Sequence, residues 1–326
     1  MFEKYSFIAG ALCQSGDRFL RTGYKETTMT VPEVIRELAA RHVAQGVEIH
    51  HRGNEDDAYI NALCDAMASG GLKPTFVNTW TYGERQWRFG SLSAANATTR
   101  HDAIARCKSS IDYAKKLGAL GVSLWLGQDG FDYAFQTDYQ AQWSHLVESL
   151  KELCDYADGL PVALEPKPRE PRNHSLIDNV QTALLLRQES GRGNLGITVD
   201  TGHVIAGGQG LGQSLALAIH YGALYNLHTN DNYGTWDDDM IVGSVRLMEP
   251  LETFYLLKKY DYQGYISVDI FPYRENAIDA VEESIRCMMD YDRKIEKLGL
   301  EKIDALISSE DMPATLGAIR KAVFGA

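Results

Sequence analysis

Short, β-rich apolar runs alternate with longer amphipathic segments about eight times along this 326-residue chain. The runs lack a clean in/out alternation, as expected of strands that are covered on both faces. Strand–helix–strand units in series predict a parallel sheet. We predict strands at Phe7–Leu12, Val47–His50, Thr75–Asn78, Val122–Leu126, Val162–Glu165, Gly196–Asp200, Leu224–His228 and Tyr265–Asp269.

The boundaries of the helices are marked in several places. Thr30–Glu33 reads as a capping box with a proline in the first turn, so a helix is expected to begin there. Four glycines fall between a predicted helix and the next strand, where a left-handed C-cap residue is favourable. They are Gly46, Gly71, Gly118 and Gly264.

Four of the predicted strands stop at a residue that can bind a metal: Glu165, Asp200, His228 and Asp269. In a (β/α)8 barrel the interior is packed with branched apolar residues, and chemistry sits at the carboxyl ends of the strands. Three hard oxygen donors and one nitrogen suit Mg2+, Mn2+ or Co2+.

A doubly wound sheet is the competing architecture for the same alternation. Ligands of such sheets gather at one switch point, whereas the polar strand ends here are spread over many strands. No G-x-G-x-x-G or P-loop motif supports a nucleotide site. We therefore predict an α/β fold, a (β/α)8 TIM barrel of residues 1–297 that forms the catalytic domain. Residues 298–326 are expected to be a short C-terminal helical extension that packs on the barrel or on a partner subunit.

Composition excludes several classes of protein. The net charge of −12 disfavours a nucleic-acid partner, because phosphate binding relies on clustered Lys and Arg. No apolar stretch approaches the length of a membrane span, and the first residues do not resemble a signal peptide. Five scattered cysteines fit a reduced compartment. A soluble cytoplasmic protein is the expectation.

Three short segments carry candidate chemistry. In Glu165–Pro168 the carboxylate of Glu165 and the ammonium of Lys167 are two residues apart and point to the same side. Alone, the two would form a salt bridge. Beside a metal, Lys167 would instead polarise a substrate oxygen. In Asp200–His203 a turn at Gly202 lets Asp200 and His203 reach one point. The run Trp236–Asp239 contains three consecutive Asp residues, which form either a solvated loop or a cation site; the alternation would make Asp237 and Asp239 the chelating pair.

Histidines and tryptophans supply candidate substrate contacts. His50 and His51 end the second predicted strand, and one of them could position or deprotonate a sugar hydroxyl while the other is structural. Trp80 and Trp125 follow strand ends. Such rings belong either to the core or to an apolar wall for the C–H face of a sugar.

Taken together, these segments resemble the xylose isomerase-like TIM barrels, and within them the aldose–ketose isomerases. The similarity runs from roughly Val47 to Asp269. EPKPREP is similar to the E-P-K-P-N-E-P segment of the family, and LWLGQDG to its L-W-G-G-R-E-G. GSLSAANATTR and HTNDNYGTWDDDMIVG resemble two further family segments. Xylose isomerases have Glu in place of Asp200 and Asp in place of His228, so the ligand pattern resembles that of the rhamnose isomerases of broad sugar range.

This resemblance implies two divalent cations per subunit. Glu165, Asp200, His228 and Asp269 would hold one, and Asp200, His203, Asp237 and Asp239 the other. Lys167 would act beside the substrate together with Glu165 and Asp269. Trp125 and Trp80 would form the sugar wall, with His50 or His51 at a hydroxyl, although the second strand lacks the usual H-D-x-D run. A loop at Arg85–Phe89 would reach a neighbouring subunit of a homo-oligomer.

The resemblance thus implies a metal-dependent isomerase that interconverts an aldose and its ketose, by hydride shift or through an enediol. Free tetroses, pentoses (including branched apiose) and deoxyhexoses are the candidate substrates. The alternative is a single-metal ketose 3-epimerase or keto-isomerase with a two-carboxylate proton relay, which usually has Glu where Asp269 stands. A nuclease is disfavoured by the acidic balance. A sugar-binding protein would have no need of two metals.

Overall fold

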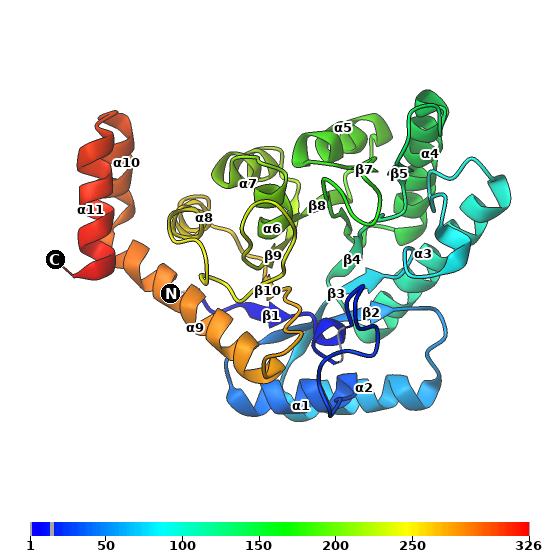
Figure 1. Ribbon diagram of the computed structural model, residues 1–326, viewed down its shortest axis with the longest axis horizontal. Coiled ribbons are helices and arrows are strands. Elements are labelled where there is room, and N and C mark those ends of the chain that lie inside the picture. The colour runs from blue at the N-terminus through cyan, green and yellow to red at the C-terminus, as the bar shows by residue number, and fades with distance from the viewer. Residues whose placement is uncertain (1, 14–15, 326) are drawn as a thin grey trace.

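A computed structural model describes residues 2–13 and 16–325. Its principal element is an eight-stranded parallel sheet in the order β1-β10-β9-β8-β6-β4-β3-β2 (Figure 1). A parallel bridge between Ile8 and Glu48 brings the two end strands together, so the sheet forms a (β/α)8 TIM barrel. The strands are β1 (Tyr5–Phe7), β2 (Gly46–His51), β3 (Lys73–Thr79), β4 (Gly121–Leu124), β6 (Val162–Leu164), β8 (Leu195–Asp200), β9 (Leu224–Thr229) and β10 (Ile266–Val268).

Helices follow the strands and cover the outside of the barrel (Figure 1). The capping box at Thr30–Glu33 is confirmed, and Asn or Asp side chains cap several other helices. The helices are α1 (Val31–Arg41), α2 (Asp57–Gly70), α3 (Ala97–Leu117), α4 (Tyr139–Ala157), α5 (Val180–Ser190), α6 (Thr201–Ala206), α7 (Leu211–His220), α8 (Met248–Lys259) and α9 (Ala277–Leu298), with the short 3-10 turns η1 (Ala9–Leu12) and η2 (Arg85–Trp87).

Two of the four glycines are left-handed C-caps as expected, namely Gly71 and Gly118. The prediction is wrong for Gly46 and Gly264. Gly46 is the first residue of β2, where a Cβ atom would lie 2.5 Å from Thr75, so close packing is what requires glycine there. Gly264 has no left-handed conformation either; a Cβ atom would lie 2.2 Å from the hydroxyl of Tyr262.

The first strand also differs from its prediction. It ends at Phe7, and most of the run predicted as Phe7–Leu12 forms η1 instead. Apolar residues continue across both elements, which hid the boundary. Gly10 in this turn lies against His50, because a Cβ atom on it would be 2.5 Å from the His50 Nδ1. The turn therefore helps to position a side chain at the end of β2.

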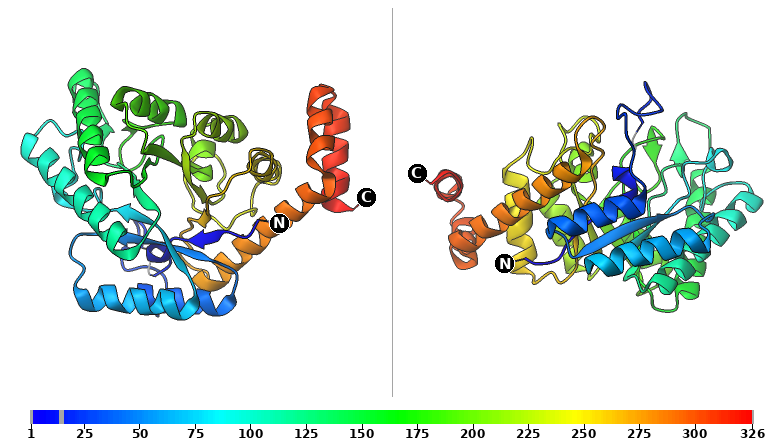
Figure 2. Two further views of the ribbon diagram at one scale, coloured as in Figure 1. Left: turned by 180° about the vertical axis from the view of Figure 1, so that it is seen from behind. Right: turned by 90° about the horizontal axis from the view of Figure 1, so that it is seen from below.

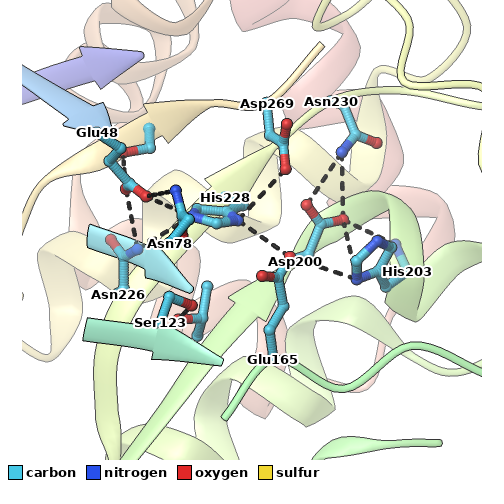
Figure 3. Close-up of polar contacts among 12 residues, drawn as sticks. Glu48, Asn78, Ser123, Glu165, Asp200, His203, Asn226, His228, Asn230 and Asp269 are labelled. Atoms are coloured by element: carbon cyan, nitrogen blue, oxygen red, sulfur yellow. Dashed lines mark hydrogen bonds and ion pairs between the residues drawn. The ribbon is translucent and has the colours of Figure 1, made fainter. Parts of the chain in front are cut away.

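The barrel interior is partly polar rather than filled with branched apolar residues alone. One buried set of side chains comes from seven different strands, and several of its members donate to the carboxylate of Glu48. In Figure 3 the labelled members of this set lie to the left, across His228 from Asp200 and His203. The set consists of Ser6, Glu48, Asn78, Ser123, Thr198, Asn226 and Ser267.

Beyond the barrel, α10 (Leu300–Ser308) and α11 (Met312–Phe324) form a helical hairpin. Figures 1 and 2 show it projecting from the end of α9, which confirms the predicted C-terminal helical extension. No side chain of α11 is buried.

A small antiparallel sheet of β5 (Gly130–Phe131) and β7 (His174–Ser175), which the sequence did not predict, lies among the loops. Within residues 2–13 and 16–325, no helix is both long and apolar enough to cross a membrane.

Candidate metal centre

The carboxyl ends of β6, β8, β9 and β10 bring Glu165, Asp200, His228 and Asp269 together (Figure 3). Each offers one ligand atom, and these atoms all lie within 4.8 Å of one another. The His228 Nδ1 is 3.1 Å from a Glu165 oxygen and 3.5 Å from an Asp269 oxygen. Only Asp269 is partly exposed. The arrangement is one that a divalent cation with hard oxygen donors could occupy.

A second group shares Asp200 with the first and adds His203 and Asp237, again with ligand atoms within 4.8 Å. Asp200 caps α6 by accepting from the backbone N–H of His203 at 2.8 Å, which draws the two side chains together. Gly202 is required here because a Cβ atom would lie 1.8 Å from Asn230 and 2.8 Å from Asp237. The sharp turn predicted at Gly202 is wrong, because Gly202 lies in the first turn of α6 (Thr201–Ala206); glycine is needed there because the Asp237 loop packs closely against this helix.

Lys167 lies beside this second group. Its Nζ is 2.8 Å from Asp237 and 2.9 Å from Glu170, and it stands 5.1 Å from the Trp125 ring. Burial by itself would lower the pKa of Lys167, but the charges of Asp237 and Asp239 raise it above its usual range. The carboxylates therefore favour the charged ammonium, which can stabilise negative charge on an oxygen placed near it.

Asp239 does not join either group among the described residues. Its backbone is left-handed, with φ of 47°, and its carbonyl accepts from the N–H of Phe271, which holds this part of the loop in place. Burial and the charge of Asp237 raise the pKa of Asp239 well above its usual range. The predicted Asp237/Asp239 chelating pair is thus represented by Asp237 alone in this geometry.

The mouth acids and imidazoles have displaced pKa values because like charges are crowded in a buried place. Burial raises the pKa of Asp269 to about 8, with Asp200 and Glu165 adding to the effect. Burial would lower the pKa of His203, yet Asp200 and Asp237 raise it to about 9. For Glu165 burial is outweighed by His228, and the pKa is lowered. Excess negative charge that holds protons in this way is what a bound cation would relieve.

Glu48 is a functional candidate that the sequence reasoning missed. It is fully buried in the middle of β2, and its carboxylate is 3.0 Å from the His228 Nε2. Ligands were predicted at strand ends, whereas Glu48 stands inside a strand between Val47 and Ile49. The signal was a charged residue inside an apolar strand, two positions before His50 and therefore on the same face.

An aromatic row borders the site. Trp80 lies edge-on to His50 at 5.5 Å, and Tyr82 bridges Trp80 at 4.4 Å and Trp125 at 4.2 Å. Tyr82 was not predicted, because it lies in the loop beyond its strand. Burial and the charge of Glu165 raise the pKa of Tyr82 well above its usual range. Trp80 and Trp125 therefore belong to one row of rings that runs beside His50 and Lys167.

The two histidines of β2 face opposite sides. Burial, with the charge of Arg52, lowers the pKa of His50 to about 4, so its ring is neutral at pH 7. His51 faces the outer helices, with its Nδ1 3.0 Å from Ser110 and its ring 4.7 Å from Tyr113. The prediction that His51 binds substrate does not fit this position, since successive strand residues alternate between faces.

A family model described as xylose isomerase-like TIM barrel matches residues 36–291. Among solved structures, a D-tagatose 3-epimerase-like protein superposes with a TM-score of 0.69 at 17% identity, covering 91% of this chain and 100% of that one. A 3-keto-D-glucoside 4-epimerase from E. coli has a TM-score of 0.67 at 17% identity, covering 88% and 99%. A D-psicose 3-epimerase from Clostridium cellulolyticum H10 has a TM-score of 0.66 at 17% identity, covering 89% and 98%.

Proposed function

The chain belongs to the xylose isomerase-like TIM barrel family, and we propose that within it this protein is a divalent-metal-dependent isomerase that interconverts an aldose and its ketose. The observation that carries the proposal is the pair of ligand groups that share Asp200, with Lys167 held against Asp237. A single-metal site would need only the first group. The second group and its lysine are what a two-metal isomerase would use.

The donor set fits Mn2+, Mg2+ or Co2+, since carboxylates and imidazole nitrogens are the available ligands. When bound, such cations act as Lewis acids and as a template for adjacent sugar oxygens. Glu165, Asp200, His228 and Asp269 would hold one cation, and Asp200, His203 and Asp237 the other. Asp239 would stand beside the second cation without being one of its ligands.

The remaining groups would act on the sugar directly. Lys167 would stabilise the negative charge that develops on a sugar oxygen, an effect that is strongest where water is excluded. His50, with its neutral ring, would exchange a proton or a hydrogen bond with a hydroxyl. Trp80, Tyr82 and Trp125 would offer an apolar wall to the C–H face. The substrates that we propose are free tetroses, pentoses including branched apiose, or deoxyhexoses.

Association of copies is part of the proposal. Phe89 follows η2 and is 67% exposed, whereas its neighbour Trp87 is buried. We propose that this loop contacts another subunit of a homo-oligomer, which light scattering of the purified protein would test.

A ketose 3-epimerase is the second candidate, and one observation favours it. Glu165 and Asp269 lie on the same side of His228, and the pKa of Glu165 is lowered while that of Asp269 is raised to about 8. Two carboxyl groups with separated pKa values can serve as a base and an acid. Such a relay needs neither Lys167 nor Asp237.

A screen of free sugars separates the two functions. Aldoses and ketoses are incubated with Mn2+, Co2+ or Mg2+, with EDTA-treated protein as the blank, and the products are identified by NMR. The isomerase interconverts an aldose and its ketose, whereas the epimerase inverts one carbon of a ketose. Lys167→Met is expected to reduce isomerase turnover by roughly 10²–10³-fold, and Lys151→Met, on the exposed face of α4, is the matched control. Epimer as the sole product, formed equally by Lys167→Met, would overturn the isomerase proposal.

A further inference from the structure

We propose that Glu48 is a positioning residue that fixes the ring of His228 so that its Nδ1 faces the metal. The inference rests on the proposed metal-dependent function. His228 lies between two sets of carboxylates (Figure 3). Its Nδ1 faces Glu165 and Asp269 in the mouth, and its Nε2 is 3.0 Å from Glu48 inside the barrel.

The neighbours of Glu48 show which way the hydrogen bond to His228 runs. The amide nitrogen of Asn78 donates to one carboxylate oxygen at 2.9 Å, and the amide nitrogen of Asn226 donates to the other at 2.9 Å. The hydroxyl of Ser267 donates to the second oxygen as well. These donors are arranged around an ionised carboxylate, which can only accept. The His228 Nε2 must therefore be the N–H that donates to Glu48.

Asn226 is held by the same carboxylate. Its amide nitrogen is 3.0 Å from the His228 Nε2, and because an amide nitrogen can only donate, this approach is not a hydrogen bond once Nε2 carries a proton; both nitrogens are directed at Glu48 instead. Turning the Asn226 amide around would direct its oxygen at Glu48 and break that bond. The tautomer of His228 and the orientation of Asn226 are thus set by the same buried charge.

The consequence for the metal site follows from the two distinct nitrogens of imidazole. With the proton on Nε2, the lone pair of Nδ1 points toward Glu165, Asp200 and Asp269, where it can bind a cation. A carboxylate that accepts from the far nitrogen also makes the ring a more basic ligand. His203 is oriented in a similar manner by a neutral acceptor, since its Nδ1 is 3.0 Å from the Pro166 carbonyl and its Nε2 faces Asp237.

A purely structural role does not account for the choice of Glu. A buried carboxylate is expensive to desolvate, and well-packed apolar residues of similar volume are often as stable or more so. Glu48 nevertheless stands at 0% exposure with donors brought to it from β3, β9 and β10. Of the contacts of Glu48, the bond to His228 is the one that joins it to the predicted cation site, because the other nitrogen of His228 faces Glu165 and Asp269.

The test measures metal affinity rather than turnover. EDTA-treated protein is titrated with MnCl2 by calorimetry as wild type, Glu48→Gln and Glu48→Leu. Glu48→Gln removes the charge and retains an acceptor, whereas Glu48→Leu removes both. Loss of such an outer partner typically weakens metal binding 10–100-fold, so we expect about 10-fold for Glu48→Gln and nearer 100-fold for Glu48→Leu.

The control is Ser123→Ala. Ser123 belongs to the same buried set but bonds Thr198 at 2.8 Å instead of Glu48, so Mn2+ affinity should be unchanged. The visible spectrum of Co2+-loaded protein gives a second measurement, which should change in the Glu48 variants and not in the control. If Glu48→Leu does not fold, as judged by circular dichroism, Glu48→Gln decides the test.

The outcomes separate this inference from the function on which it rests. Wild-type protein that binds no Mn2+ overturns the proposed function, and the role of Glu48 with it. Wild-type protein that binds Mn2+, together with Glu48 variants of wild-type affinity and spectrum, overturns the role of Glu48 alone.

Discussion

Glu48 and the acids of the barrel mouth lie on either side of His228, and their surroundings are opposite. Glu48, in the interior, receives hydrogen bonds from Asn78, Asn226, Ser267 and His228. At the mouth, Glu165, Asp200 and Asp269 face one another around His228. The protein itself supplies the hydrogen-bond donors that Glu48 needs. The acids at the mouth gather negative charge with fewer donors to balance it.

The difference appears in the pKa values. Burial would raise the pKa of both Glu48 and Asp269, but the charge and hydrogen bonds of His228 and the neighbouring donors lower that of Glu48, while Asp269 is raised to about 8. Burial alone therefore does not tell a structural acid from a functional one. What tells them apart is whether the protein itself supplies the donors.

The largest effect is expected from removing the ligand that both groups at the mouth share. Asp200 belongs to both groups, so Asp200→Asn should weaken both cation sites and reduce kcat/KM on the order of 10³-fold, as expected for loss of principal electrostatic groups. Asp238→Asn, in the neighbouring loop but outside both groups, is the control. Steady-state kinetics with Mn2+ measure both. Equal activity of the two variants would show that the mouth acids are not the reaction centre.

At Glu48 the largest effect should be on folding. Glu48→Ala leaves several buried donors without an acceptor and removes one partner of a buried pair, which costs about 3 kcal/mol of unfolding free energy. Urea denaturation in EDTA measures this. A loss well below 1 kcal/mol would mean that the interior network is no more complete than the mouth.

Cation binding should stabilise the mouth specifically. At a Mn2+ concentration about 100 times Kd, the unfolding free energy of the wild-type protein should rise by about 2.7 kcal/mol. Asp200→Asn should show little of this gain, whereas Ser123→Ala should retain it. Thermal unfolding with and without EDTA makes the measurement. An equal gain in Asp200→Asn would place the bound cation elsewhere.

The comparison also explains what the sequence could predict. Glu165, Asp200, His228 and Asp269 stand at the ends of apolar runs, and parallel strands must bring their carboxyl ends to one rim, so their convergence followed from order along the chain. The barrel and its helical extension were predictable on the same grounds. Glu48 was not, because its meaning depends on donors from strands that are far away in sequence, such as Asn226 and Ser267.

Other errors have equally local causes. The strand predicted at Phe7–Leu12 merged β1 with η1, since apolar residues fill both. Asp239 shares an alternation with Asp237, but the left-handed backbone at Asp239 breaks the extended geometry on which that alternation relied. The order of residue types along the chain was thus enough to predict where the site lies. Which side chains reach it depends on backbone conformation, as at Asp239, and on donors from distant strands, as at Glu48.

The smallest expected effect is also the most specific to charge crowding. Asp269→Asn removes one of the facing acids, so the metal-free protein should become more stable at pH 8. The gain should be only about 1 kcal/mol, because the remaining acids can take up a shared proton and already relieve part of the repulsion. The pKa of Asp269 is raised from 3.8 to about 8 in the folded chain. Between these values the unfolded chain ionises this group while the folded chain keeps it protonated, so stability falls as the pH rises through the interval. The gain from Asn should therefore be smaller at pH 5 than at pH 8. Urea unfolding in EDTA at both pH values tests this, with Asp238→Asn as the control. A gain of equal size at pH 5 would attribute the effect to packing instead of to the repulsion that distinguishes the mouth from Glu48.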